Sequence, residues 1–218
     1  MDNKSTEDYI KSIYRLEQDN GTALTTSLAR LLGVGAGSVT DMVKKLSDKR
    51  LLHYEPYQGA KLTPDGKRLA LKMVRRHRLW EMFLVTFLNY KWDEVHDEAE
   101  RLEHVTSEGL EQRIDKALGY PKVDPHGDPI PTAEGELIDV SYKSLSDCNV
   151  SDEGVIVRVS DDSPEMLQLL TKLGLGLNTK IRISQKVKYD GSVIITMGGR
   201  EIPLSPVMSK SIFINIPE

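Results

Sequence analysis

The sequence has one cysteine, Cys148, among its 218 residues. An internal disulfide framework is therefore excluded, and so sparse a use of cysteine is typical of a reducing compartment. The N-terminal stretch MDNKSTEDYI is polar and acidic, so no secretory signal peptide is expected there. No apolar run in the sequence is long enough to cross a membrane. These absences predict a cytoplasmic protein that has no membrane partner.

Sequence signatures of common enzymes are also missing. Neither a nucleophile elbow nor a glycine-rich phosphate loop appears. The run Glu100-x-x-Glu103-His104 resembles a zinc-protease H-x-x-E-H helix but has Glu100 where that motif needs histidine. A di-iron Glu-x-x-His motif fails as well, because Arg101 stands three residues before His104. We therefore expect no enzyme, with a metalloenzyme as the weaker alternative.

Charge is distributed unevenly along the chain. The net charge is −4, yet residues 1–78 hold 15 lysines and arginines against 9 aspartates and glutamates. Residues 79–150 hold 6 against 16, and residues 151–218 hold 8 against 8. A basic front can face a polyanion, and an acidic middle can collect cations. The charge pattern predicts two functions in different parts of the chain.

Residues 1–73 are predicted to form a winged helix-turn-helix. Apolar residues at helical spacing mark helices over 5–18, 25–33 and 38–50, and the last two are joined by a glycine-containing turn. Residues 51–63 then read as two strands around a turn. Because the second helix of such a pair enters the major groove, this order of elements predicts a reader of double-stranded operator DNA.

The side chains expected to face DNA are mostly hydroxylated or cationic. Small hydroxylated residues can approach base edges, and lysines neutralise phosphates. The candidates are Thr25, Thr26, Ser38, Thr40, Asp41, Lys44, Lys45, Lys49, Tyr57, Gln58 and Lys61. Such modules also serve protein contacts, and lysine-rich helix faces are often merely solvated, so the order of the elements carries more weight than the charge.

Residues 74–140 are predicted to be helical. Thr63-Pro64 opens a long helix in the preferred way, with threonine as N-cap and proline at the first helical position. Further helices are expected over 92–105 and 107–119, followed by a proline- and glycine-rich connector over 121–131.

The stretch VHDEAERLEHV, residues 95–105, sorts its ionisable residues by helix face. At about 100° per residue, one stripe beside the apolar face carries His96, Glu100, Glu103 and His104. Charges beside a core are costly unless they are paired or coordinate a metal, and the helix offers few cations to this stripe. A divalent metal site is the preferred interpretation, and a solvated acidic face is the alternative.

Two further pairs extend this pattern of possible ligands. His77 and Glu81 are four residues apart on the long helix and share a face, although such a pair is often a surface salt bridge. Asp124 and His126 flank a proline in the connector. All these donors are carboxylates or imidazoles, and this set suits Mn²⁺ and Fe²⁺ better than a thiolate-rich site would.

Residues 141–150 are expected to be a linker, and residues 151–218 are β-rich. Runs of β-branched or alternating residues predict strands at 154–160, 180–184, 192–197 and 211–216, with a short helix at 164–174. A small SH3-like β-barrel is the expected fold of this section. The chain as a whole is predicted to be an α+β multidomain protein.

In combination, TEDYIKSIY, HRLWEMFL, VHDEAERLEHV and PHGDPIP resemble the diphtheria toxin repressor family of metalloregulators. The resemblance covers essentially the whole chain and is greatest to manganese-responsive members that carry a third domain. It implies a winged helix-turn-helix, a helical metal-binding and dimerisation domain, and an SH3-like domain of the FeoA type. The implied function is a homodimeric, metal-dependent repressor of metal-uptake genes, with no organic cofactor.

The resemblance also implies two metal sites per subunit, holding Mn²⁺ or alternatively Fe²⁺. The primary site would use Asp8, Glu100, Glu103 and His104. Iron-type members carry sulfur-bearing residues where this chain has Asp8 and Glu100, and the harder oxygen donors favour Mn²⁺. Two-domain manganese members have an acidic residue where this chain has Lys11, so their paired-metal cluster is not expected here in its usual form.

The implied secondary site joins the long helix, the next helix, the connector and the third domain. Similar three-domain regulators have Cys-Pro-His where this connector has Asp-Pro-His. From the third domain, Asp161, Asp162 and Glu165 are available, and Asp162 is preferred. The full expected set is His77, Glu81, His96, Asp124, His126 and Asp162.

A metal held between the first helix and the dimerisation domain would fix the DNA-reading heads at the spacing of two successive major grooves. Trp80, Phe83 and Phe87 are expected to contribute to an isologous dimer interface, with some of them in the core. The remaining alternative is a winged-helix regulator that answers a small organic effector, in which case the acidic stripe would be structural.

Overall fold

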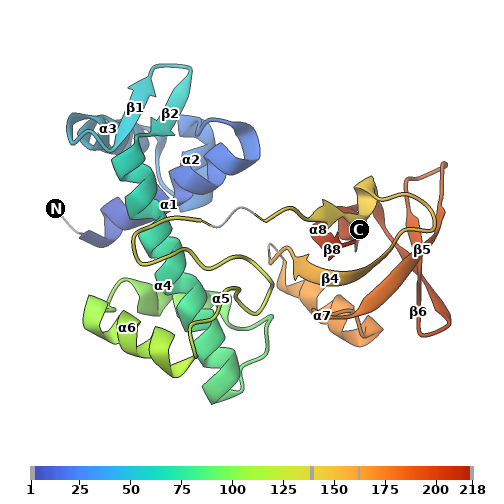
Figure 1. The fold of residues 1–218 in the computed structure, drawn as a ribbon. Helices are drawn as coiled ribbons and strands as arrows, with labels where there is room; N and C mark the ends of the chain where they lie inside the picture. The colour runs from blue at the N-terminus through green and yellow to red at the C-terminus, as the bar shows by residue number, and fades with distance from the viewer. Residues whose placement is uncertain (1–2, 138–139, 162, 217–218) are drawn as a thin grey trace. The chain divides into compact units, whose positions relative to one another are not determined.

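A computed structural model of the protein describes residues 3–137, 140–161 and 163–216 (Figure 1). Contacts divide the chain into two units. The first contains residues 1–80, 100–117 and 130–138, and the second contains residues 81–99, 118–129 and 139–218. The division passes through two helices, α4 (Pro64–Leu88) and α5 (His96–Glu103). Both helices therefore contribute side chains to both units.

The first unit opens with a winged helix-turn-helix, as the sequence predicts. Its elements are α1 (Asn3–Asn20), α2 (Thr25–Leu32), α3 (Ala36–Asp48), β1 (Leu52–Glu55) and β2 (Gly59–Leu62). The two strands pair as an antiparallel hairpin. Fully buried aliphatic side chains from all three helices form one core with the hairpin. This core holds the inner side of α3 and leaves the outer face of the helix exposed.

The N-terminus of α4 packs closely against the residue that precedes the hairpin. The Thr63 hydroxyl accepts a hydrogen bond from the Gly66 amide at 3.2 Å, which is the predicted cap. A Cβ atom at Gly66 would lie 1.9 Å from the Leu51 carbonyl oxygen. Glycine at this position is therefore required by the close approach of the helix backbone, and any side chain there would displace α4.

A buried arginine holds α6 (Glu108–Ala117) and the end of the connector against α4. Arg75 donates to Glu111 at 2.9 Å, to Asp115 at 2.6 Å and to the Pro131 carbonyl at 2.8 Å. Its side chain is 9% exposed. A buried charge with three acceptors is satisfied, so this network stabilises the helical part of the first unit.

The second unit is built on a six-stranded antiparallel sheet with the strand order β3-β8-β4-β5-β6-β7. The strands are β3 (Lys143–Ser144), β4 (Glu153–Val159), β5 (Lys180–Lys186), β6 (Val193–Met197), β7 (Arg200–Leu204) and β8 (Ile212–Asn215). The helical elements are η1 (Leu145–Asp147), α7 (Pro164–Leu173) and α8 (Pro206–Ser211). Leu167 and Leu170 of α7 join the strand residues in one core.

Four elements of the second unit, β3, η1, β7 and α8, were not expected from the sequence. Strand β3 has only two residues, and β7 contains Pro203, which is tolerated because β7 lies at the edge of the sheet. Helix α8 follows a Ser205-Pro206 start, and Ser205 accepts from the Met208 amide. Ser163-Pro164 starts α7 in the same way. The Ser-Pro pattern could therefore have predicted the start of α8 from the sequence.

Helix α5 begins at His96, four residues later than predicted. The preceding residues turn, and the side chain and carbonyl group of Trp92 serve other contacts in the second unit. The predicted domain boundaries at residues 73, 140 and 150 stay predictions. Within the described residues, no helix is long and apolar enough to span a membrane.

Candidate metal centres and DNA interface

The outer face of α3 is exposed as a DNA-reading helix requires. Val39, Val43 and Leu46 are fully buried on its inner side. The remaining candidates on this helix, Ser38, Asp41, Lys44 and Lys45, are exposed, and Thr40 is half-buried. The Thr40 hydroxyl donates to the Ala36 carbonyl at 3.0 Å, so it is engaged within the helix.

The wing and the start of α2 supply the other candidates for DNA contacts. Tyr57, at the tip of the β1–β2 hairpin, is fully exposed and has φ 67°. Gln58, Lys61 and Thr26 are also exposed, whereas Thr25 is half-buried. Lys49 lies just after α3 and is exposed. These side chains are accessible on the same module as the α3 face.

A first cluster of possible metal ligands joins α1 to α5. Asp8, Glu100 and His104 each present a donor atom within 4.8 Å of the others. The Asp8 Oδ1 and His104 Nε2 atoms are 2.9 Å apart and buried, yet neither has a hydrogen-bond partner among the described residues. Two lone pairs facing at this distance repel each other unless a proton or a cation lies with them. The pair therefore fits a divalent cation.

The orientation of His104 is set by Glu7, a residue to which the sequence pattern assigned no role. The His104 Nδ1 atom lies 2.9 Å from Glu7 Oε2, and because a carboxylate accepts, the nitrogen donates. When the imidazole is neutral, this hydrogen bond leaves its lone pair on Nε2, the atom that faces Asp8. Glu7 thus fixes the tautomer that a metal ligand needs.

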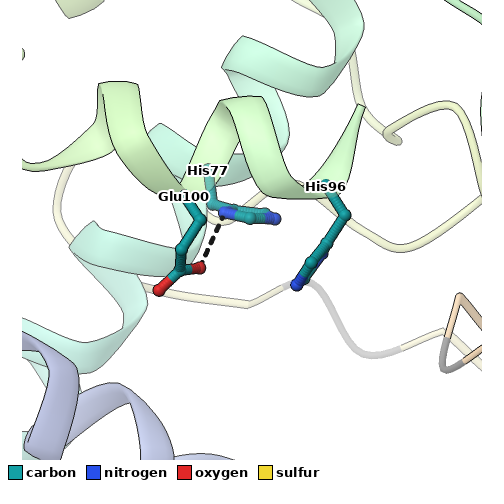
Figure 2. Close-up of side chains that lie close together, drawn as sticks. All are labelled: His77, His96 and Glu100. Carbon is teal, nitrogen blue, oxygen red and sulfur yellow. Dashed lines mark ion pairs between the residues drawn. The ribbon is translucent and has the colours of Figure 1, made fainter. Parts of the chain in front are cut away.

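Lys11 places its ammonium group among the other acidic residues of this region. Its Nζ atom donates to Glu100 Oε2 at 2.7 Å and to Glu103 at 2.8 Å and 2.9 Å, and it lies 3.1 Å from His77 Nδ1. His77 Nδ1 is 2.6 Å from Glu103 Oε2. Figure 2 shows the longer His77–Glu100 ion pair, at 3.5 Å, with His96 one turn before Glu100 on α5.

The fully buried carboxylate of Glu103 is therefore paired with Lys11 and His77. Sequence reasoning noted Lys11 as a departure from relatives but did not foresee that its charge would occupy the acidic stripe. Nothing in the spacing within α5 signals a cation that comes from α1.

Burial raises the pKa of the Asp8 carboxyl group, and the nearby Glu100 and Glu103 carboxylates raise it further, while His104 acts in the opposite sense. Each neighbouring carboxylate disfavours the ionised form of the others. A divalent cation would reverse this effect by stabilising the ionised form. The electrostatics of the cluster therefore agree with its donor geometry.

A second cluster of possible ligands lies in the second unit. Glu81 on α4 and the connector residues Asp124 and His126 present donor atoms within 4.8 Å of one another, and all three side chains are buried. The His126 Nε2 atom lies 2.7 Å from the Trp92 carbonyl oxygen, so Nε2 carries the proton. Its Nδ1 atom is buried and has no hydrogen-bond partner in the described part of the chain. An imidazole held through one nitrogen, with the other left for a ligand bond, is typical of metal sites.

The charge around His126 supports the same interpretation. Burial lowers the pKa of His126, but the carboxylates of Asp124 and Glu81 outweigh it and raise the pKa above its usual value. The Trp92 carbonyl and Asp161 act in the same direction as these carboxylates. A site that favours a proton on an imidazole also favours a metal cation there.

His96 and Asp161 extend the second cluster. His96 Nδ1 lies 3.6 Å from Glu81 Oε1 and 3.7 Å from Asp161 Oδ2. These three residues form a further group of possible ligands, which shares Glu81 with the group of Glu81, Asp124 and His126. Asp162, the preferred third-domain candidate, lies outside the described residues. Asp161 was named as available but not preferred, and the sequence gave no means of choosing between the two.

Three segments of the chain are similar to known families of protein domains. Residues 3–60 match the description "Iron dependent repressor, N-terminal DNA binding domain" and residues 63–132 match "Iron dependent repressor, metal binding and dimerisation domain". Residues 143–216 match "FeoA domain". The iron-dependent repressor IdeR of Mycobacterium leprae is 31% identical, over 90% of each chain. This chain belongs to the iron-dependent repressor family.

Other members agree with this assignment. The diphtheria toxin repressor of Corynebacterium glutamicum is 30% identical, over 92% of this chain and 91% of that protein. A solved manganese-dependent transcriptional repressor in complex with manganese is 36% identical, covers 97% of this chain and 100% of its own, and has a TM-score of 0.90. The manganese regulator SloR is 33% identical, covers 97% and 98%, and has a TM-score of 0.80. The chain is a metal-dependent DNA-binding repressor and not an enzyme.

Proposed function

We propose that Mn²⁺ is the metal that controls this repressor, with Fe²⁺ as the alternative, and that each chain holds two ions. The observation that carries this proposal is the close approach of Asp8 Oδ1 and His104 Nε2, two buried atoms 2.9 Å apart that have no hydrogen-bond partner among the described residues. The second ion would be held by Glu81, Asp124 and His126. Neither cluster contains sulfur, and hard oxygen and imidazole donors suit Mn²⁺ and Fe²⁺. Two solved relatives, at 36% and 33% identity, are a manganese-dependent repressor and a manganese regulator.

The proposed primary site comprises Asp8, Glu100 and His104, with Glu103 next to them. When bound, the metal supplies the positive charge that allows these anionic donors to lie together. Asp8 is on α1, which packs against α2 and β2 of the DNA-reading module. Glu100 and His104 come from α5 and the residue after it. A metal bound both by α1 and by the α5 region would hold the DNA-reading module, and with it α3, in one orientation.

The DNA partner is proposed to be an operator that controls metal-uptake genes in the cytoplasm. Two α3 helices of a homodimer would reach successive major grooves, because dimeric helix-turn-helix proteins bind half-sites one helical turn apart. The proposed contacts are the exposed α3 and wing residues. Lysines would bind phosphates, and Ser38 would approach a base edge.

The homodimer interface is proposed to include Phe87, whose side chain is 48% exposed at the end of α4. Its ring packs against Phe83 with centroids 5.0 Å apart. Trp80 is half-buried and donates its indole N–H to Thr106 at 2.7 Å, which favours a role inside the first unit. Of the three aromatic residues expected at the interface, Phe87 is the best placed.

The test of the proposed function is operator binding by Glu100→Ala. The Glu100 side chain is 42% exposed, so its removal should leave the fold intact. The matched control is Asp97→Ala, because Asp97 is an exposed carboxylate on the same helix and lies outside both clusters. A mobility shift on promoter DNA would be measured for each variant with Mn²⁺, with Fe²⁺ and with EDTA.

We expect wild-type and Asp97→Ala proteins to shift DNA with Mn²⁺ and to release it in EDTA, whereas Glu100→Ala loses the metal-dependent shift. Normal metal dependence in Glu100→Ala would overturn the primary-site assignment. A wild-type shift that ignores EDTA would instead support a repressor controlled by an organic effector.

A further inference from the structure

The connector carries two of the proposed ligands of the second site on one tight turn. Asp124 Oδ1 accepts hydrogen bonds from the amides of His126 at 2.8 Å and Asp128 at 3.0 Å. The Asp124 amide donates in turn to the Asp128 carbonyl at 2.9 Å. Gly127, between the two residues whose amides donate, has φ 91°. The direction of the Asp124 carboxylate and the His126 ring therefore depends on the shape of this turn.

Strand β4 of the third domain touches this turn at three consecutive residues. The Val159 amide donates to the His126 carbonyl at 2.8 Å. Arg158 Nε donates to Asp128 Oδ1 at 2.9 Å. A Cβ atom at Gly127 would lie 2.0 Å from the Val157 carbonyl oxygen, so the backbones are in direct contact. The turn and the strand pack without room for adjustment.

Arg158 is the only side chain among these three contacts that bonds the turn. Its guanidinium carbon lies 4.5 Å from the centroid of the Phe213 ring, in a cation–π arrangement. The ring restricts the guanidinium, and Asp128 accepts a hydrogen bond from its Nε atom. The side chains of Arg158 and Asp128 are 27% and 12% exposed, so their ion pair is mostly shielded from water. A planar, restrained guanidinium holds a carboxylate in a defined direction.

We propose that Arg158 is a positioning residue for the second metal site: by holding Asp128, it fixes the turn that presents Asp124 and His126. The inference rests on the proposed second site and adds a role for the third domain. Residues 143–216 match the FeoA domain, whereas Asp124 and His126 lie outside it. The third domain would thus position the ligands of the second site by shaping the connector, in addition to any ligand that it supplies.

Electrostatics and positioning predict opposite effects when Arg158 is neutralised. Removing a positive charge near Glu81, Asp124 and His126 would by charge alone strengthen the binding of a cation. Loosening the turn would weaken it, because residues that orient metal ligands typically contribute 10- to 100-fold in affinity. The sign of the change therefore separates a positioning role from a simple charge effect.

The experiment compares Arg158→Gln with Arg182→Gln. Both changes remove one positive charge, and Arg182 lies on the adjacent strand β5, where it pairs with Glu153 at 3.6 Å on an exposed surface. Mn²⁺ binding to each full-length protein would be followed by titration calorimetry. We expect two equivalents in the wild type and in Arg182→Gln, and about tenfold or weaker affinity for one equivalent in Arg158→Gln. Affinity equal to that of Arg182→Gln, or tighter binding, would overturn the proposal.

A second measurement needs no metal. Hydrogen exchange of the Val159 amide reports its bond to the His126 carbonyl, and this exchange should be faster in Arg158→Gln than in Arg182→Gln. Unchanged exchange would count against the positioning role even if the metal affinity fell. If the wild type binds only one equivalent, the proposed second site itself is wrong, and the role of Arg158 falls with it.

Discussion

Replacing Lys11 with methionine removes an ammonium group that the structure places among the α5 carboxylates of the first unit. The Lys11 Nζ atom lies 2.7 Å from Glu100 and 2.8 Å from Glu103. Methionine keeps a flexible chain of similar length but carries no charge. The substitution therefore tests whether Lys11 stabilises the metal-free protein by neutralising carboxylates that a metal would otherwise neutralise.

The magnitude follows from burial. Exposed ion pairs contribute at most about 1 kcal/mol, whereas breaking a buried pair by removing one partner costs about 3–5 kcal/mol. The Glu103 side chain is fully buried, Lys11 is 20% exposed, and Glu100 is 42% exposed. We expect a loss near the lower end, about 3 kcal/mol. At roughly 2–4 °C for each kcal/mol in a protein of this size, the unfolding temperature should fall by about 6–12 °C.

The assay is thermal unfolding followed by circular dichroism, in EDTA and in excess Mn²⁺. Mn²⁺ should raise the unfolding temperature of Lys11→Met more than that of the wild type, because no ammonium competes for Glu100. Lys116→Met is the charge-matched control, since Lys116 is exposed on α6 in the same unit. Equal unfolding temperatures in EDTA, or equal gains with Mn²⁺, would refute this account of Lys11.

Two further predictions concern the primary site and the DNA interface. Glu7→Ala removes the acceptor for His104 Nδ1–H and should weaken Mn²⁺ binding at the primary site about tenfold in titration calorimetry. Glu7→Gln keeps an acceptor, so its affinity for Mn²⁺ should stay near that of the wild type. Equal affinity in both variants would contradict the role of Glu7. Lys44→Ala should weaken operator binding similarly for all sequences and lower the salt dependence of binding by about one ion, as measured by fluorescence anisotropy, and an unchanged slope would remove Lys44 from the phosphate contacts.

The helical stripe on α5 shows how far sequence periodicity reaches. A repeat of 3.6 residues places His96, Glu100, Glu103 and His104 on one side of a helix, and the structure indeed gathers them near other ionisable groups. Periodicity says nothing about partners from other elements. Glu103 turns to Lys11 of α1, while His104 turns to Asp8. Which partner each residue of the stripe meets depends on how α1 packs against it. The spacing of residues within α5 does not encode that packing.

The β-rich section gives a similar contrast. Runs such as GVIVRVS and SVIITM predicted central strands, because β-branched residues buried on a sheet leave a clear pattern. The two-residue β3 and the proline-containing β7 leave none. Their strand conformation comes from pairing with β8 and β6 rather than from local preference.

The sequence by itself determined the order of the domains, the winged helix-turn-helix, and the family of donor atoms available for a metal, since local periodicity, caps and residue chemistry are written in neighbouring positions. Only the tertiary structure decided which donors meet. Asp8 reaches His104 across 96 positions of sequence, and the connector turn is shaped by β4, 30 residues further on. Such contacts depend on how whole elements bury their apolar faces, and this packing is a property of the folded chain.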